Sequence, residues 1–246
     1  MSLEYLIAIL PTVVIIFVIL SFDRYNREPV WLLSLLFIAG IISAFPAIIL
    51  ETLYSSIFGE PYTAIGLVLQ AFFGVALMEE GVKYIADKLI AYNSRSYDEL
   101  YDGIIYCATV SLGFATLENI AYVGKYGIST GIVRAITSVP GHAIFGVLMG
   151  YFLSLAKFVP EKRSYYSLLS IAAPVAAHGI YDAILFLNLD WALLVFVPFM
   201  IYLYVKAIKL IKETNNIPPI VNNGPYDGSY DGQNEPYDDG NMTPLG

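Results

Sequence analysis

The sequence predicts an all-α fold, a polytopic transmembrane helical bundle of about seven spans, with eight as the alternative count. Of its 246 residues 57% are hydrophobic and only 14% are charged, and the mean hydropathy of +0.65 exceeds that of ordinary soluble domains. Apolar stretches of about 20 residues, which cross roughly 30 Å of hydrocarbon, recur along the chain. The predicted spans are 4–22, 30–50, 62–92, 103–123, 131–155, 166–187 and 190–210.

The first span is expected to stay in the protein as a helix. It begins beside acidic Glu4 instead of a basic segment, and no small-residue cleavage site precedes Asp23. Its apolar part is also longer than that of a signal peptide. We therefore place this segment in the bundle.

The distribution of basic residues orients the chain. With seven spans and an outer N-terminus, the outer side holds only Lys125 and, at the outer end of the predicted span 131–155, Arg134. The basic residues in cytoplasmic segments are Arg24, Arg27, Lys88, Arg95, Lys157, Lys162, Arg163, Lys206, Lys209 and Lys212. Since cytoplasmic segments are enriched in Lys and Arg, this bias supports an odd span count and a cytoplasmic C-terminus. We expect a multi-pass protein of the cell membrane, in contact with the lipid bilayer.

The composition changes after Lys212, where Asn, Gly, Pro, Asp and Tyr dominate and Tyr-Asp-Gly is nearly repeated. Such a segment cannot bury enough apolar surface to fold. We therefore divide the chain into a transmembrane helical domain, 1–212, and a disordered cytoplasmic tail, 213–246. The net charge of −8 gives no sign of a nucleic-acid partner, and a single cysteine, Cys107, excludes an intrachain disulfide and a cysteine-cluster metal site.

Ionisable side chains inside the apolar spans carry the functional signal. They are Glu79, Glu80, Lys83, Glu118, His142, His178 and Asp182. An ionised side chain at the centre of a membrane helix costs roughly 2.5–3.5 kcal/mol, so this group needs compensating partners. At about 1.5 Å per residue, Glu80, Glu118, His142 and His178 lie roughly 18–23 Å from the cytoplasmic ends of their spans. We expect four helices to converge on one buried polar site.

Spacing within each helix predicts specific pairs. Lys83 follows Glu79 by four residues and Glu80 by three, so its ammonium should serve as their counterion. His178 and Asp182 are four apart, which would let the carboxylate orient the ring. For each residue an alternative remains, namely a structural bridge or a hydrogen bond between helices.

Two prolines and two glycines indicate how the helices pack. Pro140 and Pro174 lie inside predicted spans, shortly before the two histidines, where each should kink its helix and free backbone groups. Gly146 and Gly150 form a small-xxx-small pair, which predicts a close approach between helices of one monomer.

In their order along the chain, the polar positions resemble the motifs of PrsW-type intramembrane proteases, bacterial enzymes that make the first cut in membrane-bound anti-sigma factors. The matching motifs are Glu79-Glu80-x-x-Lys83, Phe114-x-x-x-Glu118-Asn119, Pro140-Gly141-His142 with Gly146 after it, and His178-x-x-x-Asp182. The related CAAX prenyl endopeptidases and Abi-type membrane proteins carry a histidine where this chain has Glu118, which favours the PrsW branch. The resemblance implies a single-pass membrane protein, such as an anti-sigma factor, as the substrate, and a part in a stress response.

Peptide hydrolysis needs an activated water, a stabilised oxyanion and a proton for the leaving amine. We expect Glu80, with Glu79 as its partner, to be the base. His142 and His178 then either donate hydrogen bonds to the tetrahedral intermediate or, with Glu118, hold a divalent metal such as zinc. The metal-dependent and the metal-free version both remain open.

Two further interpretations accompany the protease. Asn119 could donate to the oxyanion or simply hydrogen-bond between helices. A proton-coupled transporter or channel could use the same carboxylates and histidines as a relay, and a non-catalytic receptor or scaffold could use them for packing. The sequence shows no convincing internal repeat, which favours the protease over the transporter.

Overall fold

The computed structural model describes residues 3–23 and 26–217, and these residues form helices and connecting turns without a strand. The elements are α1 (Leu3–Phe22), α2 (Val30–Phe58), α3 (Ala64–Leu69), η1 (Gln70–Ala76), α4 (Leu77–Ile90), α5 (Leu100–Tyr126), α6 (Ile128–Ile136), α7 (Ser138–Phe158), η2 (Pro160–Lys162), α8 (Arg163–Phe186) and α9 (Ala192–Thr214). The predicted all-α class is confirmed. The predicted tail lies outside the described residues from 218 onward and stays a prediction.

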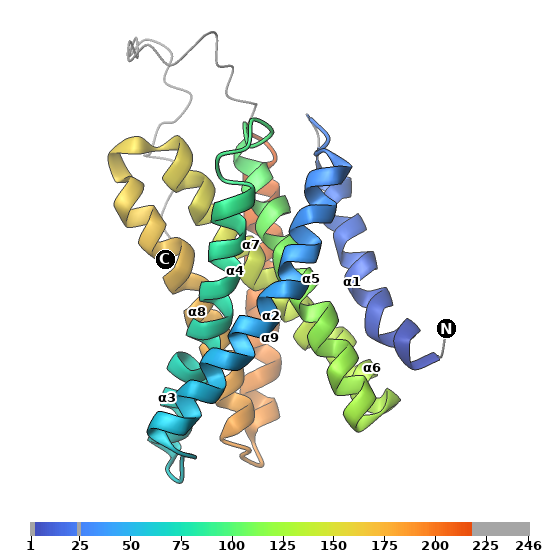
Figure 1. Cartoon of the computed structure of the whole chain (residues 1–246), viewed down its shortest axis with the longest axis vertical. Coiled ribbons are helices and arrows are strands. Elements are labelled where there is room, and N and C mark those ends of the chain that lie inside the picture. Colours follow the sequence, from blue (N-terminus) through green and yellow to red (C-terminus); the bar gives the residue numbers. More distant parts are fainter. Residues whose placement is uncertain (1–2, 24–25, 218–246) are drawn as a thin grey trace.

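Seven helical segments of the described chain are long and apolar enough to cross a membrane, as predicted. They are Glu4–Phe22, Val30–Phe58, Ala64–Ile90, Leu100–Tyr126, Ile128–Phe158, Pro160–Phe186 and Ala192–Thr214. The connections near residues 91–99 and 159–162 lie at one end of the bundle, and those near 59–63 and 187–191 lie at the other (Figure 1). This arrangement is the one that alternating crossings require.

The centre of the bundle is formed by α5 and α7, which pack directly against each other. A Cβ added at Gly150 would lie 2.0 Å from the Gly103 carbonyl oxygen, and one added at Gly146 would lie 2.6 Å from Cα of Ala108. The two backbones are therefore in contact, which confirms the predicted small-residue packing inside one chain. Outer helices present large apolar side chains to lipid, for example Phe17 of α1 and Leu194 of α9, exposed by 70% and 77%.

Two differences from the predicted spans bear on the site. The second span continues to Phe58, eight residues past its predicted end, and thereby includes Glu51. The fifth span is broken at Thr137, so Pro140 lies in the first turn of α7 and not inside a continuous helix. Because first-turn N–H groups have no intrahelical partner, proline is tolerated there without a kink. Pro174 does lie inside α8, as predicted.

The third span contains a π-helical segment that the sequence pattern did not predict. Within η1 the bonding step lengthens to five residues, and Leu77 N–H donates to the Phe72 carbonyl oxygen. The span then returns to α-helical geometry as α4, whose first turn carries Glu79 and Glu80. Such π-helical turns are frequent beside functional sites.

Candidate active site

Lys83 lies at the centre of the polar cluster and binds groups from two helices. Its Nζ is 3.0 Å from Oε2 of Glu79, 2.8 Å from Oε1 of Glu80 and 3.2 Å from Nδ1 of His142. An ammonium has three N–H donors and no acceptor, so each donor has a partner. The side chain is only 1% exposed and also lies 4.0 Å from the centre of the Phe114 ring. Lys83 is therefore a fixed counterion, as its spacing indicated.

His142 connects Lys83 to Glu118. Because the ammonium only donates, Nδ1 of His142 must accept from it, and the ring proton belongs on Nε2. That nitrogen lies 2.9 Å from Oε2 of Glu118, to which it can donate. Ser111 Oγ on α5 donates to the His142 carbonyl oxygen at 2.6 Å, which ties α7 to α5 at this residue. The sequence analysis did not single out Ser111.

His178 forms the other side of the cluster. Its Nδ1 is 2.9 Å from Oε1 of Glu80, and its Nε2 is 3.4 Å from Oδ2 of Asp182. The second contact has the length of an ion pair without the geometry of a hydrogen bond. The ring stacks on Phe145 with centres 4.7 Å apart and lies edge-on to His142 at 5.4 Å. Four of the spans therefore converge, as predicted. The contacts form one chain, which Asn119 does not join: Glu118, His142, Lys83, Glu79, Glu80, His178 and Asp182.

Burial is almost complete except at one member of this chain. The Glu80 and Lys83 side chains are 0% and 1% exposed, whereas the Glu118 side chain is 24% exposed. Pairing of opposite charges offsets the cost of removing the carboxylates and the ammonium from water. The cluster therefore opens to its surroundings on the Glu118 side.

One group of donors in the described residues could hold a metal ion. The ligand atoms of Glu79, Glu80 and His178 all lie within 4.8 Å of one another, and Oε2 of Glu80 is buried without a hydrogen-bond partner. Two carboxylates and an imidazole suit zinc and other divalent ions. The structure does not bring the ligand atoms of the predicted set, Glu118, His142 and His178, together in this way. His178 belongs to both sets.

Comparison with known proteins places the chain in a family. The sequence model described as PrsW family intramembrane metalloprotease matches residues 28–206. The chain belongs to this family. It is 35% identical to Protease PrsW of Geobacillus kaustophilus (strain HTA426) over 206 residues, which are 80% of this chain and 88% of the relative. Proteins of the same name from Bacillus subtilis (strain 168) and Clostridioides difficile (strain 630) are each 34% identical, over 79% and 86% of this chain and 88% and 92% of their own. No solved structure matches the chain.

Membership of the PrsW family establishes the enzyme class. The protein is a membrane-embedded peptidase of a metalloprotease family, so the predicted recognition, class and membrane location are confirmed. The transporter and scaffold interpretations no longer account for the cluster. The individual catalytic roles of the residues remain proposals.

Asn119 has partners outside the cluster of this PrsW-family chain. Its Nδ2 donates to the Ala8 carbonyl oxygen of α1 at 2.8 Å, and its Oδ1 accepts from Nε of Arg134 at 3.1 Å. The side chain is fully buried. These bonds favour the interpretation of Asn119 as a link between helices over that of an oxyanion donor.

Two charged residues near the site were missed by the sequence analysis. Arg134 of α6 lies 2.8 Å from Oε2 of Glu118 through its Nη2, although its position suggested an outer segment. Glu51 of α2 is close enough to Glu79 and Glu118 to interact with them electrostatically. The available signal was a charged residue inside an apolar stretch. Arg134 lies eight residues before His142, and Glu51 lies within the apolar run that ends at Phe58.

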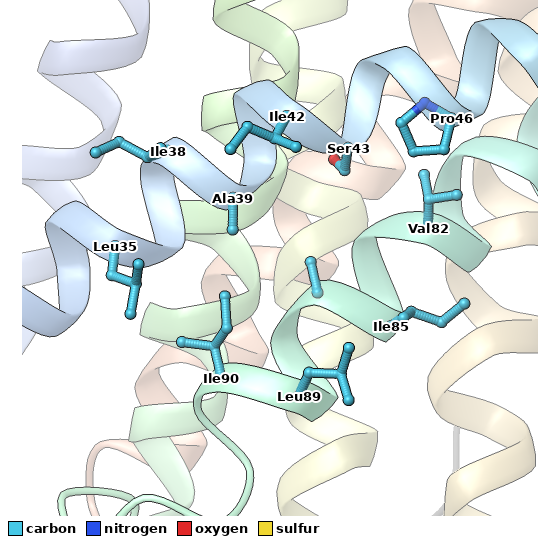
Figure 2. Close-up of a pocket in the computed structure, with 11 residues that line it drawn as sticks. Leu35, Ile38, Ala39, Ile42, Ser43, Pro46, Val82, Ile85, Leu89 and Ile90 are labelled. Atoms are coloured by element: carbon cyan, nitrogen blue, oxygen red, sulfur yellow. The ribbon is translucent and has the colours of Figure 1, made fainter.

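A separate pocket lies beside the site, between α2 and α4 (Figure 2). Its volume is about 450 Å³ and its lining is almost wholly apolar: Leu35, Ile38, Ala39, Ile42, Ser43, Pro46, Val82, Ile85, Ala86, Leu89 and Ile90. Val82 also packs against Phe114, whose ring lies beside Lys83. Without an ionisable group in its lining, this pocket has no means to activate water, and the chemistry belongs to the polar cluster.

Proposed function

We propose that the protein hydrolyses a peptide bond in a single-pass membrane protein, and that this substrate is an anti-sigma factor whose cleavage starts a stress response. The observation that carries the proposal is the continuous series of contacts from Glu118 through Lys83 to His178, inside helices long enough to cross the membrane. A membrane-spanning segment is the kind of peptide that can reach such a site. The resemblance to PrsW-type enzymes and the curated relatives named Protease PrsW support this reading.

Water is the nucleophile that the residues favour. Cys107 is buried with Met149 and Leu153, and Tyr84 packs against them. All three donors of Lys83 have partners, so its nitrogen has no free position from which to attack. The two carboxylates and two imidazoles are instead the groups that hold and move protons.

Glu79, Glu80 and His178 would hold the metal that the family description implies, and the unpaired Oε2 of Glu80 is a free ligand atom. A bound divalent ion supplies a Lewis acid that polarises a water or a carbonyl oxygen. Glu80 would serve the attacking water directly, as the base, or would help to hold the metal that polarises it.

The remaining residues position these groups and supply protons. Lys83 keeps the two carboxylates side by side, because its ammonium bonds to both. His142 holds a proton on Nε2 against Glu118, at the side of the cluster that is not fully closed. This pair is therefore placed to return a proton to the leaving amine.

The test compares membrane and released peptides from cells that express the wild-type chain or Glu80→Gln at equal abundance. We expect fragments of a single-pass protein in wild-type cells and their loss with Glu80→Gln, since the amide keeps the size but neither accepts a proton nor carries charge. Glu213→Gln is the matched control, because Glu213 is exposed and forms an exposed ion pair with Lys209 at 3.6 Å. Equal fragments from wild type and Glu80→Gln would refute the role of Glu80. Fragments that come from another kind of membrane protein would refute the anti-sigma assignment alone.

A further inference from the structure

Arg134 contacts the site from the side opposite to Lys83. Its Nη2 lies 2.8 Å from the same Oε2 of Glu118 that faces Nε2 of His142. The Nη2 contact lacks hydrogen-bond geometry, so charge and not a directed bond holds this pair. Glu118 is thus positioned between a guanidinium on α6 and an imidazole on α7.

The guanidinium is itself held by two neighbours. Its Nε donates to Oδ1 of Asn119 at 3.1 Å, and its central carbon lies 4.0 Å from the centre of the Tyr122 ring. A planar guanidinium can donate from its edge while its face lies against a ring, so one group makes both contacts. Asn119 in turn is anchored to the Ala8 carbonyl oxygen of α1. The position of Arg134 is therefore fixed by α5 and, through Asn119, by α1.

Glu118 is the member of the cluster that most needs such support. Its side chain is 24% exposed, against 4% for His142 and 5% for His178. Packing around it is therefore less complete, and a carboxylate with one neutral partner would be free to turn toward the opening. A mobile Glu118 would leave Nε2 of His142 without a fixed acceptor.

We propose that Arg134 is a positioning residue of the active site, which fixes the Glu118 carboxylate against Nε2 of His142. The inference rests on the proposed function, because Glu118 and His142 matter through their part in hydrolysis. Arg134 acts through Glu118 and does not itself touch the reacting atoms. It makes α6 and α1 part of the machinery, although α1 carries none of the predicted site residues.

The two histidines of the chain allow a test that needs no substrate. Protein labelled with ¹⁵N-histidine gives signals from His142 and His178 alone, which His178→Gln assigns. We expect Arg134→Gln to shift the ring nitrogen signals of His142 and to leave those of His178 in place. Arg134→Lys keeps the positive charge but lacks the planar guanidinium, so we expect an intermediate shift of the His142 signals. Lys209→Gln, which removes a cation from an exposed ion pair, should move neither histidine.

The second readout is cleavage of the membrane protein whose fragments appear in wild-type cells. Loss of an outer partner that orients a site residue typically costs about 10–100-fold, and we expect that loss in kcat for Arg134→Gln with little change in KM. Arg134→Lys should recover part of it.

A folded Arg134→Gln with unchanged His142 signals would overturn the proposal. So would equal movement of both histidines, which would mean a general structural role. Where Arg134→Gln does not fold, the lysine variant decides, and an unchanged His142 signal in it overturns the proposal as well. Absence of wild-type cleavage would contradict the proposed function, and the histidine signals would still report on Arg134.

Discussion

Lys83 links the two halves of the cluster, because one ammonium contacts both glutamates and His142. Two adjacent carboxylates buried between helices would repel each other and lose hydration without it. Sequence spacing predicted the two contacts within α4, since residues three and four apart share a helix face. The third contact, to His142, depends on how α4 and α7 pack, which spacing alone does not show.

Replacing Lys83 with methionine tests the counterion role. Breaking a buried ion pair by removing one partner costs about 3–5 kcal/mol, and Lys83→Met leaves two carboxylates without their cation. We expect strongly reduced accumulation and a lower Tm in detergent. Lys209→Met is the control, with a change within about 0.5 kcal/mol, because its pair with Glu213 is exposed. A Lys83→Met protein as stable as the control would show that the carboxylates need no counterion.

Measuring bound metal distinguishes two possible ligand sets. The structure brings together Glu79, Glu80 and His178, whereas the sequence suggested Glu118, His142 and His178. Chelation should abolish cleavage and added zinc should restore it, since the family is one of metalloproteases. We expect His178→Gln to lower the zinc bound per chain at least about tenfold and His142→Gln to leave it unchanged. Equal loss of zinc in both variants would instead favour Glu118, His142 and His178 as the ligands.

The sequence did not predict the charged site neighbours whose positions depend on where a helix begins or ends. Glu51 was missed because the apolar run of α2 is longer than a membrane requires, so the predicted span ended just before it. Arg134 was missed because it lies near the outer end of its span, before the break at Thr137, and the sequence does not show that it packs against Glu118. Both errors arise from tertiary packing, since hydropathy gives the existence of a span more reliably than its ends.

The contact between α5 and α7 sets the distance between two of the four site helices. Both helices are lined with small residues at their contact, and α5 carries Glu118 while α7 carries His142. A change in their separation would therefore move these two side chains apart. The small-xxx-small pattern made this contact predictable from sequence, whereas its partner residues on α5 were not.

Gly150→Ala tests the contact between α5 and α7. The added Cβ would lie 2.0 Å from the Gly103 carbonyl oxygen, a backbone atom that cannot move without its helix. We expect a loss of about 1–3 kcal/mol in stability, as for overpacked cores, and reduced cleavage. Gly124→Ala on α5 is the matched control, because its Cβ would meet nothing within 4 Å. A Gly150→Ala protein as stable as Gly124→Ala would contradict the close packing.

At the scale of the whole molecule, a group of carboxylates joins the first loop to α5. Glu28 is buried and accepts a hydrogen bond from the Tyr106 hydroxyl, with Asp102 beside it and Asp23 and Asp98 nearby. Burial raises the pKa of Glu28 from 4.5 to about 7, although the hydrogen bonds from Asp102 and Tyr106 oppose this change. Its neutral form is therefore the one that the folded protein favours.

The pH dependence of stability follows from that shift. Between pH 4.5 and about 7 the folded protein binds more protons at Glu28 than the unfolded chain does, so stability falls as the pH rises through this window. Glu28→Gln should flatten the decline in Tm between pH 5 and 8, measured in detergent. Glu213→Gln should keep the wild-type slope. An unchanged slope in Glu28→Gln would assign the pH dependence to other groups.

The π-helical segment η1 makes the orientation of the site carboxylates depend on how many residues each helical turn holds. An α-helix turns by about 100° per residue, so the extra residue held in η1 sets the rotational phase of Glu79 and Glu80 relative to α3. Thr63 caps the start of α3, and Phe72 within η1 packs against Gly179 of α8, where an added Cβ would lie 2.6 Å from the Phe72 ring. Winding the same residues as a regular α-helix would turn both carboxylates away from His178 by roughly a quarter turn. The catalytic alignment of this enzyme thus depends on a count of residues as well as on their identity.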